Sequence, residues 1–190
     1  VLRFSIAALV LGALCGFRGE LKTENVTAVW RYVLLGGVFA TYFVLMFAGL
    51  KTAPAVSAAA VFTLTPILTA LASYVLLRQI TTPRIAGGLA IGALGALWVI
   101  FRADWSAFML FEVGKGEIIY FWGCICHAIY IPLVRLLNRG ESAILFSFGT
   151  TIGGILVLLV WSWSALWSTD YAALPNIVWI TILYVSIFAT

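Results

Sequence analysis

The side chains that could carry chemistry are few and lie far apart in the sequence. His127 is the only histidine, and Cys124 precedes it by three residues on the same face of an expected helix. A structural metal site needs about four ligands and a catalytic one about three, and the neighbouring sequence supplies no others. The pattern therefore favours a packed or cavity-lining histidine and predicts neither a metal nor a cofactor. Trp122 and Tyr130 either line a cavity with His127 or pack in the core.

Arg3 is a charged residue inside an apolar run. If Arg18 marks the cytoplasmic edge of that run, Arg3 lies about 22 Å further along the helix, within the hydrocarbon zone. A charge at this depth usually faces a cavity or a partner, although a long side chain can also reach the outer interface. Both placements stay open. Because Arg3 is the only basic residue expected inside a span, it gives a slight preference for an anionic or zwitterionic solute such as an amino acid.

Acidic residues are missing from the interior of every expected span. All seven lie at span ends or in connections: Glu20, Glu24, Asp104, Glu112, Glu117, Glu141 and Asp170. This argues against a cation exporter that exchanges its solute for protons on a buried carboxylate. An intramembrane enzyme would need a nucleophile with its base, or a metal constellation, and one histidine without a buried acid provides neither. The sequence therefore predicts that the protein is not an enzyme.

The elements that hold these residues are apolar throughout. Of the 190 residues, 64% are hydrophobic and 9% are charged, and the mean hydropathy is +1.12. Soluble domains carry about 25% charged residues, so a soluble enzyme, a nucleic-acid binder and a disordered chain are excluded. Continuous apolar runs indicate helices, since barrel strands would alternate polar and apolar residues. We expect an all-α polytopic membrane protein whose partners are the lipid bilayer and a small-molecule solute.

Seven segments approach or exceed the roughly 20 apolar residues that a membrane span requires. They are 1–17, 29–50, 53–77, 83–101, 117–137, 142–166 and 174–190. The first and last are short, which we interpret as truncation of a longer protein at both ends. The connection 102–116 is either an amphipathic segment at the interface or an exposed loop.

The basic residues predict the orientation. Seven of them fall on one side of the expected spans and three on the other. The positive-inside rule then places the connections 18–28, 78–84 and 138–141 in the cytoplasm.

Proline and glycine mark places where helices bend or approach one another. Pro66 interrupts the third expected span and is either a transport hinge or a static kink, with Thr63 and Thr65 close enough to bond the freed backbone groups. Three Gly-x-x-x-Gly spacings allow close helix contacts. They are Gly12/Gly16, Gly88/Gly92 and Gly149/Gly153. Packing within one subunit is favoured, and a homodimer interface is the alternative.

A short repeat relates two of the expected spans. Val29–Thr41 (VWRYVLLGGVFAT) and Val178–Thr190 (VWITILYVSIFAT) share six of thirteen residues at an offset of 149. A weaker match pairs Phe4-Ser5 with Phe146-Ser147. The two stronger copies lie five spans apart, and because five is odd they must cross the membrane in opposite directions. Inverted repeats of this kind are typical of secondary transporters, which bind solute near mid-membrane at the repeat interface.

The stretch Phe47–Asp104 joins an alanine-rich helix with a central proline, a turn and a glycine-rich helix. The residues that form this pattern are Ala58, Ala59, Ala60, Pro66 and Gly87–Gly95. In this order they resemble the EamA-type transporters of the drug/metabolite transporter superfamily, and Leu2-Arg3-Phe4 looks like the family's second helix. Where many members carry a glutamate, this chain has Arg78.

The resemblance implies ten helices in two inverted halves of five, of which this chain would hold helices two to eight. Residues 1–104 would be the first repeat without its first helix, and residues 105–190 the second repeat, truncated after its third helix. Together with the short repeat, this predicts a secondary transporter that moves small metabolites such as amino acids by alternating access. The resemblance implies efflux and a bacterial inner (plasma) membrane, whereas the residues themselves give no direction, substrate or coupling ion. A channel is the alternative, because pore linings can use any small polar residue.

Overall fold

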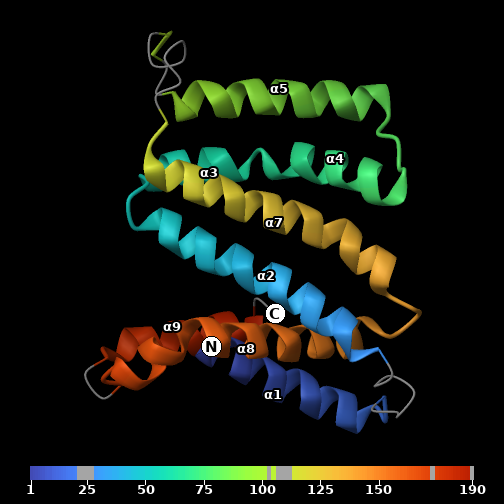
Figure 1. Cartoon of the computed structure of the whole chain (residues 1–190), viewed down its shortest axis with the longest axis vertical. Helices are drawn as coiled ribbons and strands as arrows, with labels where there is room; N and C mark the ends of the chain where they lie inside the picture. The colour runs from blue at the N-terminus through green and yellow to red at the C-terminus, as the bar shows by residue number, and fades with distance from the viewer. Residues whose placement is uncertain (21–27, 102–103, 106–112, 172–173, 189–190) are drawn as a thin grey trace. The chain divides into compact units, whose positions relative to one another are not determined.

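The regular structure in the described part of the chain is helical. The computed structural model describes residues 1–20, 28–101, 104–105, 113–171 and 174–188. Its helices are α1 (Leu2–Phe17), α2 (Val29–Leu50), α3 (Ala55–Phe62), α4 (Thr65–Leu77), α5 (Pro83–Ile100), α7 (Lys115–Leu137), α8 (Ala143–Ser168) and α9 (Asn176–Phe188) (Figure 1). The predicted helical fold is therefore confirmed for these residues. The prediction for the connection 102–116 falls largely outside them.

Five helical stretches are long and apolar enough to cross a membrane. They are Val29–Leu50, Ala55–Leu77, Pro83–Ile100, Lys115–Leu137 and Ala143–Ser164. Each coincides with a predicted span to within a few residues. The helices α1 and α9 are also apolar, at 16 and 13 residues, and are shorter than a full span. A polytopic membrane protein is thus supported by five candidate spans, while the count of seven stays a prediction.

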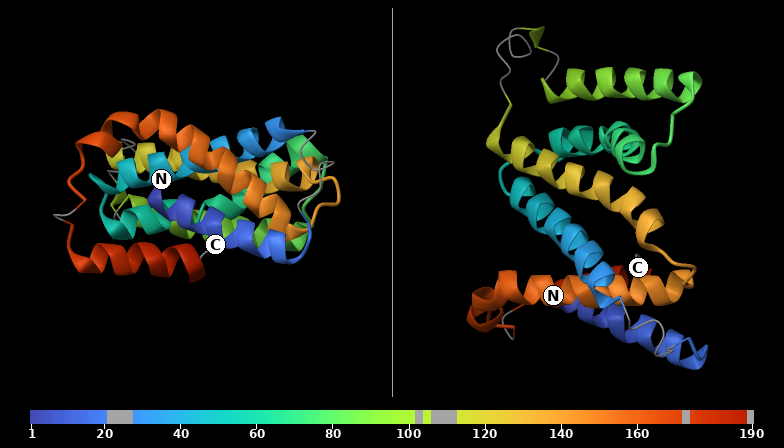
Figure 2. Two further views of the ribbon diagram at one scale, coloured as in Figure 1. Left: turned by 90° about the horizontal axis from the view of Figure 1, so that it is seen from below. Right: turned by 45° about the vertical axis from the view of Figure 1, so that its right-hand side comes forward.

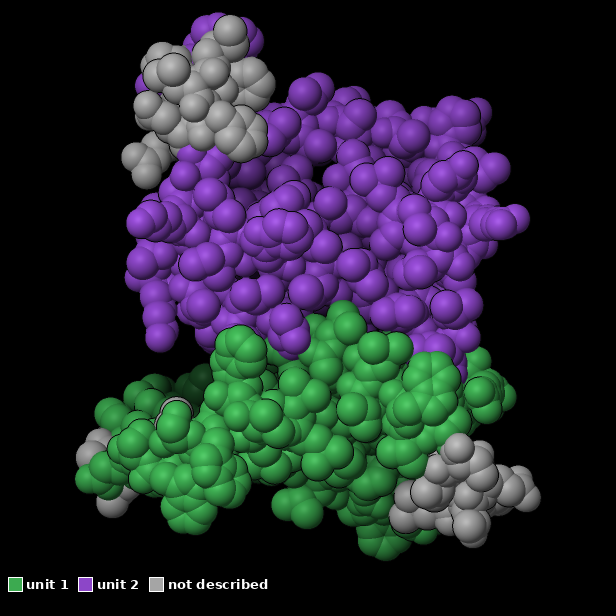
Figure 3. All heavy atoms as spheres, viewed as in Figure 1, with its two compact units in different colours: residues 1–40, 138–190 green, residues 41–137 purple. Residues whose placement is uncertain are grey.

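The chain packs as two compact units (Figure 3). Unit 1 comprises residues 1–40 and 138–190, and unit 2 comprises residues 41–137. Packing defines these units, whereas the predicted division at residue 104 rests on the family resemblance and stays a prediction.

Close helix crossings mediated by glycine build unit 1. A Cβ atom added to Gly153 would lie 2.1 Å from the carbonyl oxygen of Tyr32, and one added to Gly36 would lie 2.2 Å from the backbone nitrogen of Gly154. Only glycine permits α2 and α8 to approach this closely. On the other side of α8, Phe148 lies against Gly12 of α1. Packing within one subunit is therefore confirmed for the Gly149/Gly153 spacing.

In unit 2, α7 packs against α2, α3 and α4. Gly49 of α2 meets the backbone of Gly116 and Tyr120, and α7 also contacts both α3 and α4. A buried cluster fills the space between these helices and α5. Its members are Ala53, Ala58, Ala60, Val61, Ile100, Tyr120 and Cys124.

The third span is broken at the predicted place. The helix α3 ends at Phe62 and α4 begins at Thr65, with Pro66 in its first turn. Proline lacks an N–H, so the carbonyl of Phe62 cannot receive the usual helical hydrogen bond. Thr63 does bond a backbone group, because its hydroxyl donates to the carbonyl of Ala60 at 2.7 Å. Thr65, which we expected to do the same, has a buried hydroxyl that bonds no backbone carbonyl among the described residues.

Candidate functional site

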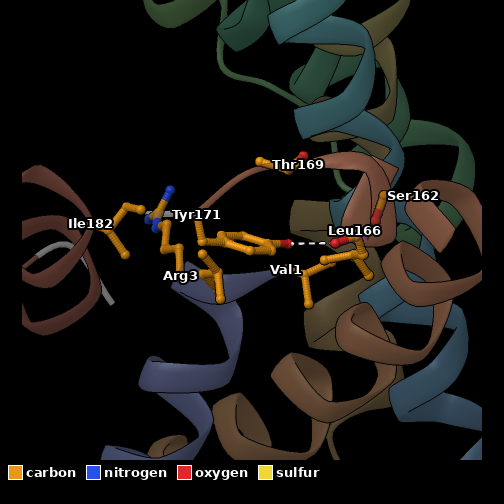
Figure 4. Close-up of a pocket in the computed structure, with 8 residues that line it drawn as sticks. Val1, Arg3, Ser162, Leu166, Thr169, Tyr171 and Ile182 are labelled. Atoms are coloured by element: carbon orange, nitrogen blue, oxygen red, sulfur yellow. Dashed lines mark hydrogen bonds between the residues drawn. The ribbon is translucent and has the colours of Figure 1, made fainter. Parts of the chain in front are cut away.

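An open pocket in unit 1 contains Arg3. Its volume is about 340 Å³, and α1, the end of α8 and α9 form its walls (Figure 4). The polar lining residues are Arg3, Ser162, Thr169 and Tyr171, and Ile182 of α9 closes one side. Arg3 and Thr169 both interact with further groups of the protein. Arg3 therefore lines an open pocket of unit 1, and its place in a central solute cavity stays a prediction.

A kink in α8 shapes the wall opposite Arg3. The backbone of Ser162 leaves helical geometry (φ −104°, ψ 17°), and its hydroxyl donates to the carbonyl of Leu158 at 2.6 Å. Such backbone bonding by serine commonly bends helices. The Tyr171 hydroxyl donates to the carbonyl of Leu166 at 3.0 Å, which ties the connection after α8 to its last turn (Figure 4).

His127 lies in an aromatic cluster of unit 2. Its ring centroid is 4.7 Å from that of Tyr42 and 5.8 Å from that of Phe62, both in tilted arrangements. The ring is half-buried, and its Nδ1 atom is buried with no hydrogen-bond partner in the described structure. The cluster therefore joins α2, α3 and α7 around one imidazole.

The other predicted site residues belong to unit 2. Tyr130 is half-buried and has contacts of its own, whereas Trp122 is 58% exposed. Arg3 belongs to unit 1, whereas Trp122, His127 and Tyr130 belong to unit 2, and their role in a common cavity stays a prediction.

The predicted packing residues of α5 have no close neighbours. Gly88 and Gly92 are exposed, and within the described ranges nothing lies within 4 Å of a Cβ atom placed on either. Pro66 is exposed as well, at the start of α4. Their roles as packing positions or hinge stay predictions.

Sequence reasoning missed a buried ion pair in unit 1. Arg31 Nη2 lies 2.6 Å from Glu141 Oε1, and the two side chains are 3% and 6% exposed. The Tyr32 hydroxyl donates to the same oxygen at 3.3 Å, and the backbone N–H of Arg139 donates to Oε2 at 2.6 Å. The pair connects the start of α2 with the turn before α8. The sequence placed both charges at span ends, and nothing in it indicated a contact between residues 110 positions apart.

The surroundings of Glu141 keep its carboxyl ionised. Burial alone would raise its pKa, but the hydrogen bonds from Arg31 and from the Arg139 backbone outweigh burial and lower the pKa to about 2. Beside it, the Ser142 hydroxyl donates to the carboxylate of Glu20. The turn before α8 is therefore joined to the start of α2 by an ion pair, and to the segment after α1 by a hydrogen bond to a carboxylate.

The comparisons with known proteins decide the family. Residues 1–101, more than half of the chain, match the EamA-like transporter family. The chain belongs to the EamA-like transporter family. This membership points to a transporter rather than an enzyme, and to an integral membrane protein.

A curated relative extends over the whole chain. The chain is 28% identical over 195 residues to a protein of Bacillus subtilis (strain 168) described as the uncharacterized transporter YyaM. The match covers 99% of this chain and 62% of that protein, so the chain spans less than two thirds of the relative's length. No solved structure matches the chain.

Proposed function

We propose that the protein is a secondary transporter that exports small metabolites such as amino acids across the cytoplasmic membrane by alternating access. The observation that carries the proposal is the EamA-like family match over residues 1–101, on a chain with five candidate membrane spans. The relative in Bacillus subtilis, which is named as a transporter, supports the same class.

The directions of the helices in unit 1 support the inverted repeat. The stronger sequence match lies in α2 and α9, and the weaker one in α1 and α8. The two members of each pair run in opposite directions (Figures 1 and 2). Transporters that work by alternating access about a fixed central site are commonly built from two repeats of inverted topology.

The Arg3 pocket supports a preference for an anionic group on the solute. A guanidinium that lines a 340 Å³ pocket can bind a carboxylate through two parallel hydrogen bonds. The Ser162, Thr169 and Tyr171 side chains add polar groups to the lining of the same pocket. In this proposal the pocket binds the carboxylate of an amino acid or another small acid.

A transport screen tests the proposal. The full-length protein would be expressed in bacteria, and inverted membrane vesicles would be screened for uptake of labelled amino acids and other small metabolites. We expect saturable uptake of at least one metabolite, absent from vesicles without the protein. A single-channel conductance far above carrier turnover would instead identify a channel. Absence of any uptake by correctly inserted protein would contradict the proposal.

A further inference from the structure

Several hydroxyl groups in or next to the described helices bond to their own backbone. The residues that do so are Thr63, Thr150, Thr151, Ser162, Thr181 and Ser186, each donating to a carbonyl three or four residues earlier at 2.6–2.8 Å. This is the usual way for a serine or threonine to be accommodated in an apolar helix.

Two threonines of α4 depart from this behaviour. The hydroxyl oxygens of Thr65 and Thr69 are buried and bond no backbone carbonyl within the described residues, and Thr65 is only 5% exposed. They are four residues apart, so both lie on the same face of α4. A buried hydroxyl without a partner is destabilising, and in native proteins it usually marks an absent water, ion or ligand.

A further unpartnered atom lies on the neighbouring helix. The hydroxyl of Thr65 bonds the thiol of Cys124 on α7, which is a weak hydrogen-bonding group. The buried Nδ1 of His127, one turn beyond Cys124, has no hydrogen-bond partner in the part of the chain that the structure describes. Because α4 and α7 run in the same direction (Figures 1 and 2), we infer that Thr69, one turn beyond Thr65, is level with His127. The contact between the two helices therefore carries two unpartnered polar atoms and one hydroxyl with only a weak partner.

The surroundings define the chemistry that this contact can accept. The rings of Tyr42 and Phe62 pack on His127, and Cys124 belongs to the buried apolar cluster of unit 2. None of these residues carries a formal charge, and transfer of an uncompensated charge into such a place is unfavourable. Hydroxyls and an imidazole nitrogen can both donate and accept, which suits a neutral group such as an amide or a hydroxyl.

We propose that Thr65, Thr69 and His127 form a binding site for the neutral, hydrogen-bonding side chain of a transported solute, such as an amide or a hydroxyl group. The site rests on the proposed transport function but involves none of the residues of the Arg3 pocket. It lies at the break between α3 and α4, where the carbonyl of Phe62 has also lost its helical donor.

Valine substitutions test the site because they remove the hydroxyl and keep the shape. The full-length protein would carry Thr65→Val or Thr69→Val, and Thr150→Val would be the control, since Thr150 is also buried but bonds the carbonyl of Phe146. In inverted vesicles, labelled L-glutamine would be the amide-bearing probe and L-leucine the apolar probe. We expect the α4 variants to lose roughly tenfold in glutamine uptake with little change for leucine, and Thr150→Val to leave both unchanged.

Thermal unfolding separates a binding role from a structural one. Removal of an unpartnered buried hydroxyl should leave the melting temperature of Thr65→Val and Thr69→Val equal to or above that of wild type. Reduced glutamine uptake without reduced stability therefore supports binding. Raised stability with unchanged glutamine uptake would show that the hydroxyls face only a water molecule or an unfilled space, and would overturn the proposal.

Protection of an introduced cysteine from a thiol reagent measures binding at the site without requiring transport. In protein with Cys15, Cys124 and Cys126 replaced by alanine, Thr69→Cys would be treated with methyl methanethiosulfonate, with Thr150→Cys as the control. We expect Thr69→Cys to react and L-glutamine, but not L-leucine, to slow the reaction. If leucine is carried and glutamine neither is carried nor protects, this inference fails while the proposed function stands. If no metabolite is carried yet glutamine still protects, the proposed function fails and the site stands.

Discussion

Replacement of Glu141 by glutamine should destabilise unit 1 by about 3 kcal/mol at pH 7, because it removes the carboxylate that pairs with the buried guanidinium of Arg31. Glutamine keeps the shape of the side chain and can still accept hydrogen bonds from Tyr32 and the Arg139 backbone, so the change isolates the charge. The pKa of Glu141 gives the same magnitude independently. A fall from its ordinary value of 4.5 to about 2 corresponds to about 3 kcal/mol in favour of the ionised folded state.

The pH dependence has a definite sign. Because folding lowers the pKa of the Glu141 carboxyl, its contribution is fully present above pH 4.5 and is lost as the pH falls toward 2. The difference in unfolding free energy between wild type and Glu141→Gln should therefore be largest at neutral pH and shrink progressively below pH 4.5. Unfolding in detergent micelles by heat or denaturant, followed by tryptophan fluorescence, measures it.

Two further variants make this prediction sharp. Arg139→Ala should have little effect, since Arg139 reaches Glu141 through its backbone N–H and its side chain is exposed. The double change Arg31→Leu with Glu141→Leu should cost less than Glu141→Gln alone, because it removes both buried charges together. Wild-type stability of Glu141→Gln at pH 7 would refute the assignment of Arg31 and Glu141 as a buried, mutually dependent pair.

Three other predictions follow from the same structure. Gly153→Ala should destabilise the protein by roughly 1–3 kcal/mol or more, because its Cβ would overlap the Tyr32 carbonyl. Gly92→Ala should be neutral or stabilising by up to about 1 kcal/mol. Equal melting temperatures for the two variants would contradict the crossing of α2 and α8. Arg3→Lys should retain part of the transport activity and Arg3→Ala almost none, because lysine keeps the charge but lacks the planar guanidinium. Full transport by a correctly inserted Arg3→Ala protein would assign Arg3 to the outer interface. Single cysteines in 78–84 and 138–141 should resist an impermeant thiol reagent applied outside the cell while those in 51–53 and 168–170 react, and the reverse pattern would invert the orientation.

The helices were predictable because their signals are local. A run of about 20 apolar residues must form a helix in lipid, so five candidate spans could be placed from composition alone. The break at Pro66 was equally accessible, since the missing N–H is a property of one residue. The threonine that bonds the freed backbone was only half predictable: Thr63 does so and Thr65 does not. Their difference depends on the position of α7, which no local pattern encodes.

The contacts between distant segments were not predictable from one sequence. Arg31 and Glu141 both count as charges at span ends, and only the crossing of α2 with α8 makes them a buried pair. The spacing Gly88/Gly92 looks the same in sequence as Gly149/Gly153, yet only the second meets another helix among the described residues. Likewise, an aromatic residue on a membrane helix can face lipid or core, and the 58% exposure of Trp122 depends on how α7 is rotated against its neighbours.

The packing order in unit 1 bears on the predicted repeat. In this unit α2 packs on α8, α8 on α1, and α1 on α9. A two-fold axis that exchanges α1 with α8 and α2 with α9 leaves this packing order unchanged. Such an axis maps the pair α2 and α8 onto the pair α9 and α1. Because α2 and α8 run in the same direction, α1 and α9 must do so as well (Figure 1). The helix directions fulfil that requirement, as they do in any chain whose successive spans alternate in direction, so the repeat itself stays a prediction.

The predicted repeat differs at the positions where α2 meets α8. At the offset of 149, Gly36 and Gly37 of α2 correspond to Val185 and Ser186 of α9. Glycine at position 36 lets α2 come into backbone contact with α8. The corresponding positions of α9 carry side chains, and a helix with side chains at a crossing cannot approach its neighbour as closely as one with glycine. If α2 and α9 are symmetry mates, α9 should therefore lie further from α1 than α2 lies from α8, and equal separations of the two helix pairs would contradict this interpretation of the glycine positions.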